Sequence, residues 1–155
     1  MDTRVAEAEE SPRVQTFVVH GTPRPQGSGA MVTSASTGKS FKKYSAPSVA
    51  WRNIVIDALM TQRGEATVPV EVPVAVTLTF RFDRPRSHSK RRRASDGHIK
   101  ENGTDIDKLT RAILDALTVA KVVDDDRQVS DLYACKRYCR EGEVEGVTIM
   151  VVPVG

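Results

Sequence analysis

Alternation of apolar and polar residues marks the clearest strand of the chain, over residues 71–82. Apolar side chains occupy every second position there: Val72, Val74, Val76, Leu78, Phe80 and Phe82. A period of two is typical of a strand that buries one face. Shorter apolar and β-branched stretches predict three further strands, at residues 15–20, about 128–138 and 144–153.

Helical spacing of apolar residues marks two other stretches. The first predicts a helix of about three to four turns, with Ser48 as N-cap, Gly64 beyond its end and Trp51 anchoring its buried face. Its apolar positions are Val49, Ile54, Val55, Ala58 and Leu59. The second predicts a helix over residues 105–120, with Thr104 as a natural N-cap. Its apolar positions are Ile106, Leu109, Ile113, Ala116, Leu117 and Ala120.

The remaining segments lack such periodicity. Residues 21–29 are rich in Gly and Pro and lack the lysine spacing of a nucleotide-binding loop, so we expect a turn-rich connection. Residues 30–47 predict a weak hairpin or a mobile flap, with Lys39, Lys42 and Lys43 around Gly38. The resulting order of elements predicts one α+β domain over residues 14–155, with a mixed or antiparallel sheet and two main helices.

Composition excludes several classes of protein. The 155 residues, 39% of them hydrophobic and 28% charged, are typical of a globular protein with one core, and no apolar run is long enough to cross a bilayer. Residues 1–13 are polar and acidic, which predicts a disordered leader rather than a signal peptide, and hence a cytoplasmic location. Cys135 and Cys139 are the only cysteines, so we expect reduced thiols and neither a zinc site nor a disulfide.

Charge is unevenly distributed, although the net charge is only +3. Residues 81–100 hold eight basic residues against two acidic ones, a balance of +6, whereas residues 101–131 hold eight acidic against four basic, a balance of −4. The basic block predicts a polyanionic ligand. Acidic groups beside it would repel phosphates unless a divalent cation lay between them, as in metal-dependent nucleases and polymerases. The candidates to hold a DNA backbone are Arg84, Arg86, Lys90, Arg91, Arg92, Arg93 and Lys100.

Two acidic clusters are candidate metal ligands, and each also has an ordinary explanation. Taken alone, Thr104 followed by Asp107 resembles a capping box at a helix start, which is the more common reason for such a pattern. The triple acid at residues 124–126 is likewise typical of a polar turn. Together with the basic loop, however, the two clusters describe carboxylates for a hard cation beside cations for a phosphate.

The run TDIDKLTRAILDALTVAKVVDDDRQV, residues 104–129, resembles the RusA-type Holliday junction resolvases. In that family Asp-x-Asp opens a helix, Leu-x-basic and Asp-Ala-Leu follow, and Asp-Asp-x-Gln-Val comes after it. Looser similarities extend to HGTPRPQGS, to FRFDRPRSH and to Lys136. The resemblance implies an α+β, RusA-like nuclease domain that cuts four-way DNA junctions.

The resemblance also implies roles for single residues. Asp105, Asp107 and Asp126 match the family's catalytic, metal-binding carboxylates, for which Mg²⁺ is expected and Mn²⁺ is an alternative. Arg111 occupies the place of a frequent essential lysine, and Lys108 replaces a frequent asparagine. Arginine keeps the positive charge but differs from lysine in geometry.

Geometry predicts how the acidic clusters meet. A helix over residues 105–120 is about 24 Å long, which carries Asp126 away from Asp105. The six residues after Ala120 can return at most about 20 Å. A twofold dimer with antiparallel helices would instead bring the acidic turn of one subunit to the helix start of the other. We therefore expect a homodimer whose sites are composite in trans.

Three kinds of polar residue outside these clusters also carry expectations. His88 and His98 are expected to be solvated loop residues, and Asp115 a structural partner to a base. Lys136 is as readily a plain strand lysine as a residue that points into the site and contacts DNA.

The combined prediction is a Mg²⁺-dependent endodeoxyribonuclease that makes paired symmetric nicks in four-way junctions during DNA recombination and repair, associated with the nucleoid through its DNA. The rival is a non-catalytic, structure-selective DNA-binding protein whose acidic residues merely cap a helix and fill a turn. A nuclease for flaps or other branched DNA is a third alternative, and both a cellular and a phage genome remain open as its origin.

Overall fold

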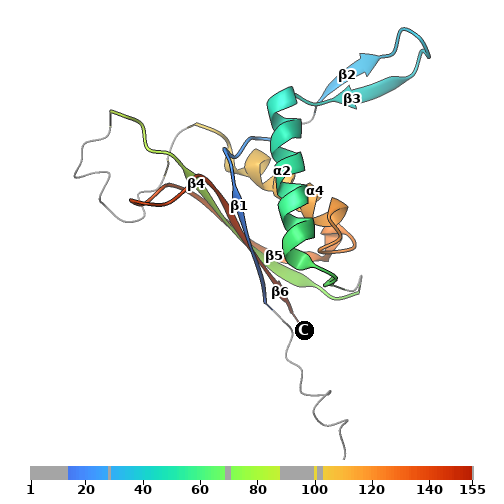
Figure 1. Ribbon diagram of the computed structural model, residues 1–155. Coiled ribbons are helices and arrows are strands. Elements are labelled where there is room, and N and C mark those ends of the chain that lie inside the picture. The colour runs from blue at the N-terminus through green and yellow to red at the C-terminus, as the bar shows by residue number, and fades with distance from the viewer. Residues whose placement is uncertain (1–13, 28, 69–70, 88–99, 101–102, 155) are drawn as a thin grey trace, which may run out of the picture.

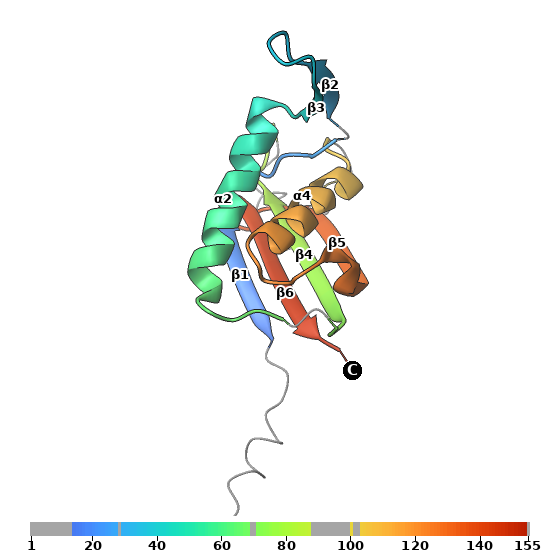
Figure 2. The same cartoon turned by 90° about the vertical axis from the view of Figure 1, so that its right-hand side faces the viewer.

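The structure, a computed structural model, describes residues 14–27, 29–68, 71–87, 100 and 103–154. One layer is a four-stranded sheet in the order β1-β6-β4-β5, and the second layer is a pair of helices on one of its faces (Figures 1 and 2). The strands are β1 (Gln15–His20), β4 (Val74–Phe82), β5 (Val129–Tyr138) and β6 (Gly146–Pro153). The helices are α2 (Ala46–Arg63) and α4 (Ile106–Val119).

Strand direction makes the sheet mixed, as predicted. β6 pairs antiparallel with both β1 and β4, whereas β4 pairs parallel with β5. The connection from β4 to β5 contains α4, as a parallel crossover requires. β5 therefore lies at the edge of the sheet, beside the helix that carries the first acidic cluster. The α+β fold class is confirmed.

The core lies between the sheet and the two helices. Alternate residues of β4 point into it, and Val74, Val76, Leu78 and Phe80 are each at most 1% exposed. The buried positions of α4 follow the predicted spacing and include Leu109, Ile113 and Leu117, while α2 contributes Trp51, Val55 and Leu59. The period-two and helical predictions are thus confirmed by burial.

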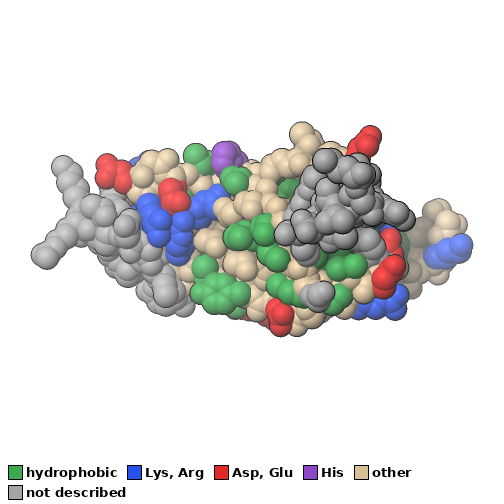
Figure 3. Space-filling view, turned by 90° about the horizontal axis from the view of Figure 1, so that it is seen from below, with side chains coloured by type: hydrophobic (Ala, Val, Ile, Leu, Met, Phe, Trp, Pro, Cys, Tyr) green, Lys and Arg blue, Asp and Glu red, His purple; other side chains and the backbone are tan. Residues whose placement is uncertain are grey.

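The opposite face of the sheet carries mixed side chains. Within the part of the chain that the structure describes, no helix covers it, and Val18 and Met150 are among its exposed apolar residues. Seen from below, apolar side chains lie in its middle, and basic and acidic ones lie towards both of its ends (Figure 3). Arg81 belongs to this face and is nonetheless only 5% exposed, because its guanidinium donates to the Val144 carbonyl and to Thr148 Oγ1.

Two predicted N-caps are wrong. α2 begins after Ser45 rather than Ser48, because Ser45 has an extended backbone, its Oγ accepts from Ser48 N, and Pro47 is tolerated in the first turn. Ser48 instead donates its hydroxyl to the Pro25 carbonyl, 2.6 Å away. The N-cap of α4 is Asp105, not Thr104. Gly64 ends α2 as predicted.

Residues 30–47 contain the hairpin that was one of the two predicted alternatives. Strands β2 (Ala30–Thr33) and β3 (Ser40–Lys43) pair antiparallel and form a two-stranded sheet of their own. The hairpin projects from the start of α2 (Figures 1 and 2). The predicted leader, residues 1–13, lies outside the described residues.

Two further predictions concern the cysteines and the membrane. Cys135 and Cys139 are both free, and burial raises the pKa of the Cys139 thiol. In the described segments, no helix is long and apolar enough to cross a membrane.

An ion pair closes the turn between β5 and β6. Arg137 Nη1 and Nη2 lie 2.6 and 2.9 Å from the two carboxylate oxygens of Glu143, and the Arg140 backbone N–H donates to the same carboxylate. The bond from Arg137 is the largest reason why the pKa of Glu143 is lowered from 4.5 to about 2. The charged form of Glu143 therefore stabilises the folded state.

Glu143→Gln is expected to lower the free energy of unfolding at pH 7 by about 1–2 kcal/mol. The folded-state pKa of Glu143 is depressed, so its contribution is complete above pH 4.5 and disappears as the pH falls towards 2. Urea denaturation at pH 7 and pH 2.5 measures both values. Glu141→Gln, an exposed change in the same turn, is the control. An equal loss at both pH values would contradict the ion-pair explanation.

Candidate active site

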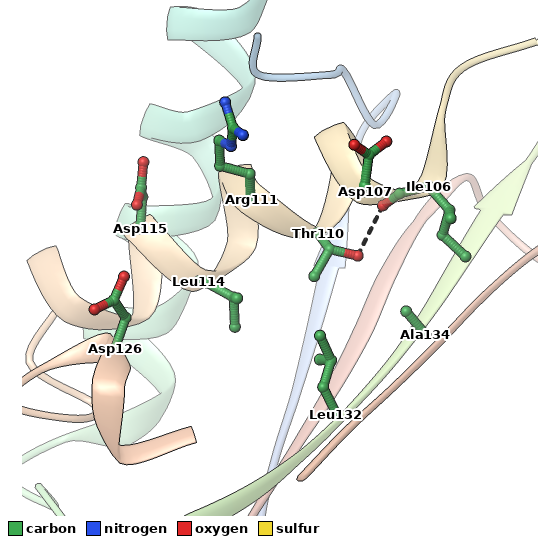
Figure 4. A pocket seen from close by; sticks show the side chains of 9 residues that line it. All are labelled: Ile106, Asp107, Thr110, Arg111, Leu114, Asp115, Asp126, Leu132 and Ala134. Atoms are coloured by element: carbon green, nitrogen blue, oxygen red, sulfur yellow. Dashed lines mark hydrogen bonds between the residues drawn. The ribbon is translucent and has the colours of Figure 1, made fainter. Parts of the chain in front are cut away.

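A groove of about 550 Å³ runs between α4 and the edge strand β5. Its apolar floor comes from both elements, and four polar or charged groups of α4 and one acid from the following turn lie along it (Figure 4). The lining residues are Ile106, Asp107, Thr110, Arg111, Leu114, Asp115, Asp126, Leu132 and Ala134. The groove therefore contains two of the three predicted catalytic acids and the predicted catalytic arginine.

The start of α4 presents two exposed carboxylates, and the one at its N-cap position makes no capping hydrogen bond. Asp105 is the N-cap by backbone position, but its side chain makes no capping hydrogen bond. Its Oδ2 lies 3.4 Å from the Lys108 ammonium, and both side chains are about half exposed or more. Asp107 is exposed in the first turn. The ordinary capping explanation, with Thr104 as cap and Asp107 as its partner, is thus wrong for this helix.

Asp107, Arg111 and Asp115 form a stripe along α4. They are spaced by four residues, so they lie on one side of the helix and cover about 12 Å of its length (Figure 4). Asp115 accepts a hydrogen bond from Gln26 Nε2, and Gln26 is 5% exposed. Asp115 was expected to pair with a basic side chain. That prediction is wrong, because its partner is the uncharged amide of Gln26, in the turn-rich loop.

The acidic turn is held by a glutamine. Gln128 Oε1 accepts from the backbone N–H groups of Asp124 and Asp125, at 2.8 and 2.9 Å, and its Nε2 donates to the Val72 carbonyl. Asp125 caps the short helix η1 (Asp126–Gln128). The Arg127 backbone N–H is the largest cause that lowers the pKa of Asp125. The polar-turn explanation is therefore confirmed for Asp125.

Asp126 differs from its neighbour in position. It is exposed at the first residue of η1 and lines the groove beside the C-terminal half of α4, near Asp115 (Figure 4). A second hollow of about 240 Å³ also includes Asp115 and Asp126, together with Arg52 of α2. Asp126 is thus presented at the end of the groove remote from Asp107.

The structure brings some of the predicted site residues together and keeps others apart. Asp107 and Arg111 are neighbours on one helix, but Asp126 lies at the other end of the groove (Figure 4). Among the described residues, no group of three or more acidic, histidine or cysteine side chains is arranged to hold a metal ion. Within one chain, the three carboxylates therefore do not converge.

Three of the predicted DNA-contacting residues lie near the ends of β4 and β5. The guanidinium of Arg84 and the ammonium of Lys100 lie 6.0 and 4.9 Å from the centre of the Tyr138 ring. Lys136 Nζ donates to the Thr104 carbonyl over 2.7 Å, directly before Asp105. Both ends of the basic loop thus lie beside β5, and Lys136 points to the start of α4 rather than being a plain strand lysine.

The structure describes only some of the other residues that were predicted to contact DNA. Arg86 is exposed after β4. Lys90, Arg91, Arg92 and Arg93, with His88 and His98, lie outside the described residues.

Sequence reasoning missed Gln26 and Gln128, which position the site without lining it. For Gln128 a signal was present, because Asp125 followed three residues later by Gln is a capping-box pattern, and the capping box forms. No local pattern links Gln26 to Asp115, since 89 positions separate them.

Comparison with known families gives a match over most of the chain. A sequence model described as Endodeoxyribonuclease RusA matches residues 20–151, from the end of β1 into β6. No curated protein matches the chain.

Proposed function

The chain belongs to the RusA endodeoxyribonuclease family, and from this premise we propose that it is a Mg²⁺-dependent nuclease that resolves four-way DNA junctions by paired symmetric nicks, in recombination and repair. The observation that carries this proposal is the start of α4. Asp105 and Asp107 are exposed there, the Asp105 carboxylate is not used as a cap, and Arg111 follows one turn later. A side-chain cap would have tied the Asp105 carboxylate to a backbone N–H group of the first turn.

The donor set fits a divalent metal ion. Hard cations such as Mg²⁺ take oxygen ligands, and one or two carboxylates with water and substrate phosphate are a common set. Asp105 and Asp107 would hold the ion from one chain, with Asp126 as the third carboxylate. When bound, the ion would polarise the scissile phosphate and make a water molecule more acidic. Mn²⁺ has the same ligand preference and is expected to substitute.

The chain's own residues have separate tasks in the hydrolysis. Water attacks phosphorus in line with the leaving oxygen, and negative charge grows on the phosphate oxygens. The Arg111 guanidinium, which is exposed and lines the same groove as Asp107, would offset that charge. Lys136 and the basic loop would hold the DNA backbone without reading bases. These contacts suit a substrate recognised by shape.

We further propose that two chains complete each site. The three carboxylates do not converge within one chain, and the groove between Asp107 and Asp126 has an apolar floor that includes Leu132, which is 48% exposed. A twofold partner lying in antiparallel orientation along α4 would cover that floor and bring its Asp126 towards Asp107. Two such sites related by the twofold axis suit the two symmetric cuts that a four-way junction needs.

A cleavage assay tests the proposed activity. The purified chain is incubated with a four-way junction, a flap and a linear duplex, each with Mg²⁺ and with EDTA. We expect paired nicks in the junction with Mg²⁺ and no cleavage with EDTA. Junction binding without cleavage under any divalent ion would favour the non-catalytic rival, and faster cleavage of the flap would favour the third alternative.

A further inference from the structure

The β2–β3 hairpin lies in a long segment without acidic residues. Residues 14–56 contain no Asp or Glu, but they contain five basic residues. These are Arg24, Lys39, Lys42, Lys43 and Arg52. Three of them belong to the hairpin or its turn, so this projection is cationic although the net charge of the chain is only +3.

The hairpin also exposes large apolar side chains. Met31 is 66% and Phe41 is 48% exposed. Met31 pairs with Lys42 and Phe41 pairs with Val32, so each face of the hairpin carries an apolar side chain near a lysine. A two-stranded hairpin is only marginally stable in water, and side chains as exposed as those of Met31 and Phe41 gain little from burial in it. Their position calls for a ligand with both anionic and apolar surface.

The root of the hairpin is fixed to the candidate site. The ring of Tyr44 packs where a side chain on Gly29 would lie, 3.0 Å from an added Cβ, and Gly29 has φ +77°. The Arg52 guanidinium lies 5.9 Å from the centre of that ring. On the other side, Gln26 N donates to the Lys108 carbonyl over 3.0 Å. The hairpin thus projects from the loop that is bonded to the first turn of α4.

Nucleic acid has the required combination of surfaces. Phosphates attract clustered lysines, and the faces of unstacked bases accept apolar and aromatic side chains. A branch point offers such bases where the arms separate, whereas a continuous duplex stacks them. Because the loop that carries the hairpin is bonded to the first turn of α4, a DNA phosphate at Asp105 and Asp107 would lie near that loop.

We propose that the β2–β3 hairpin is a DNA-binding arm, in which Lys39, Lys42 and Lys43 contact phosphates of the substrate and Met31 and Phe41 pack on bases exposed at the branch point. This inference rests on the proposed function, because it takes branched DNA as the substrate. It adds to the basic loop a second, separate contact surface, rooted beside the first turn of α4.

Binding measurements in an Asp107→Asn background, which is intended to bind without cutting, test the arm. Dissociation constants for a four-way junction and a linear duplex are measured over a series of salt concentrations. The charge variants are Lys42→Gln and the triple change of Lys39, Lys42 and Lys43 to Gln. Each lysine that contacts a phosphate should contribute about 0.9 to the slope of log K against log salt. We expect the slope to fall by about 1 and by about 2–3, respectively.

Apolar variants test the contact with bases. Met31→Ser and Phe41→Ser are expected to weaken junction binding about 5-fold or more and duplex binding much less. Lys121→Gln and Met60→Ser are matched controls, because Lys121 lies beyond the far end of α4 and Met60, 50% exposed, lies on α2. Both controls should keep the parent's affinity and salt slope. Thermal unfolding checks that every variant is folded.

Three results would overturn the inference, and they are distinguishable. If the hairpin variants match the parent in affinity and slope, the arm does not bind DNA, although the proposed function stands. If the hairpin variants change the molecular mass of the protein in solution, and DNA affinity falls only in the variants whose mass changes, the hairpin contacts a second copy of the chain. If the Asp107→Asn parent itself binds the junction no more tightly than the duplex, the proposed function fails, and the substrate proposed for the arm fails with it.

Discussion

Asp107→Asn is expected to reduce Mg²⁺-dependent junction cleavage by at least about 100-fold, while junction binding is kept or becomes tighter. The substitution keeps the size of the side chain but removes an anionic metal ligand. Asp107 is exposed in the first turn of α4, so the fold should not change. Binding should not weaken, because one negative charge beside the phosphates is lost. Single-turnover cleavage and an equilibrium binding assay measure the two effects separately.

Asp57→Asn is the matched control for this experiment. Asp57 is also an exposed aspartate on a helix, but it belongs to α2 and does not line the groove. The Asp57→Asn variant should cleave the junction at the wild-type rate. Loss of both cleavage and binding in Asp107→Asn, with the fold intact, would show that Asp107 serves substrate binding and would remove it from the catalytic set.

Mixing two inactive variants is expected to restore activity, which is the second large effect. If Asp126 acts in trans, a mixed dimer of Asp107→Asn and Asp126→Asn contains one site with both changes and one site with neither. Random exchange of equal amounts makes half of the dimers mixed, so about a quarter of the sites are intact. We expect up to about a quarter of the wild-type nicking rate, from two preparations that are each inactive.

The products of the mixture provide a second readout. A mixed dimer has one working site, so it should nick one strand and leave the paired cut unmade. If Asp126 acts in cis, every dimer in the mixture has a damaged carboxylate set in each site, and no activity returns. Recovery of nicking therefore separates the two arrangements without knowledge of the metal ion.

Much of the fold could be predicted because its information is local. β1 was predicted with its observed bounds, since an apolar run ends at Gly21. α4 was predicted within one residue at each end from its apolar spacing. The start of α2 was placed too late, because Ser45 and the two residues after it carry no apolar period. The burial of Arg81 could not be predicted, because its partners Val144 and Thr148 belong to another strand and its turn.

The candidate site shows the same division between local and distant information. The position of Asp105 and Asp107 at the start of a helix follows from adjacent residues, and the structure agrees. The bond between Gln26 and Asp115 and the register that places β5 beside β4 depend on segments far apart in the chain. That Asp126 shares one site with the other two acids remains a prediction, because it depends on a second chain.

The missing side-chain cap at the start of α4 has a consequence for local opening. A side-chain cap typically contributes about 1 kcal/mol to a helix, and α4 forgoes it at Asp105. The first turn of the helix therefore depends on bonds from other segments, from Gln26 N to the Lys108 carbonyl and from Lys136 Nζ to the Thr104 carbonyl. Local opening of that turn would have to break both bonds, so its opening is coupled to the loop before the hairpin and to β5.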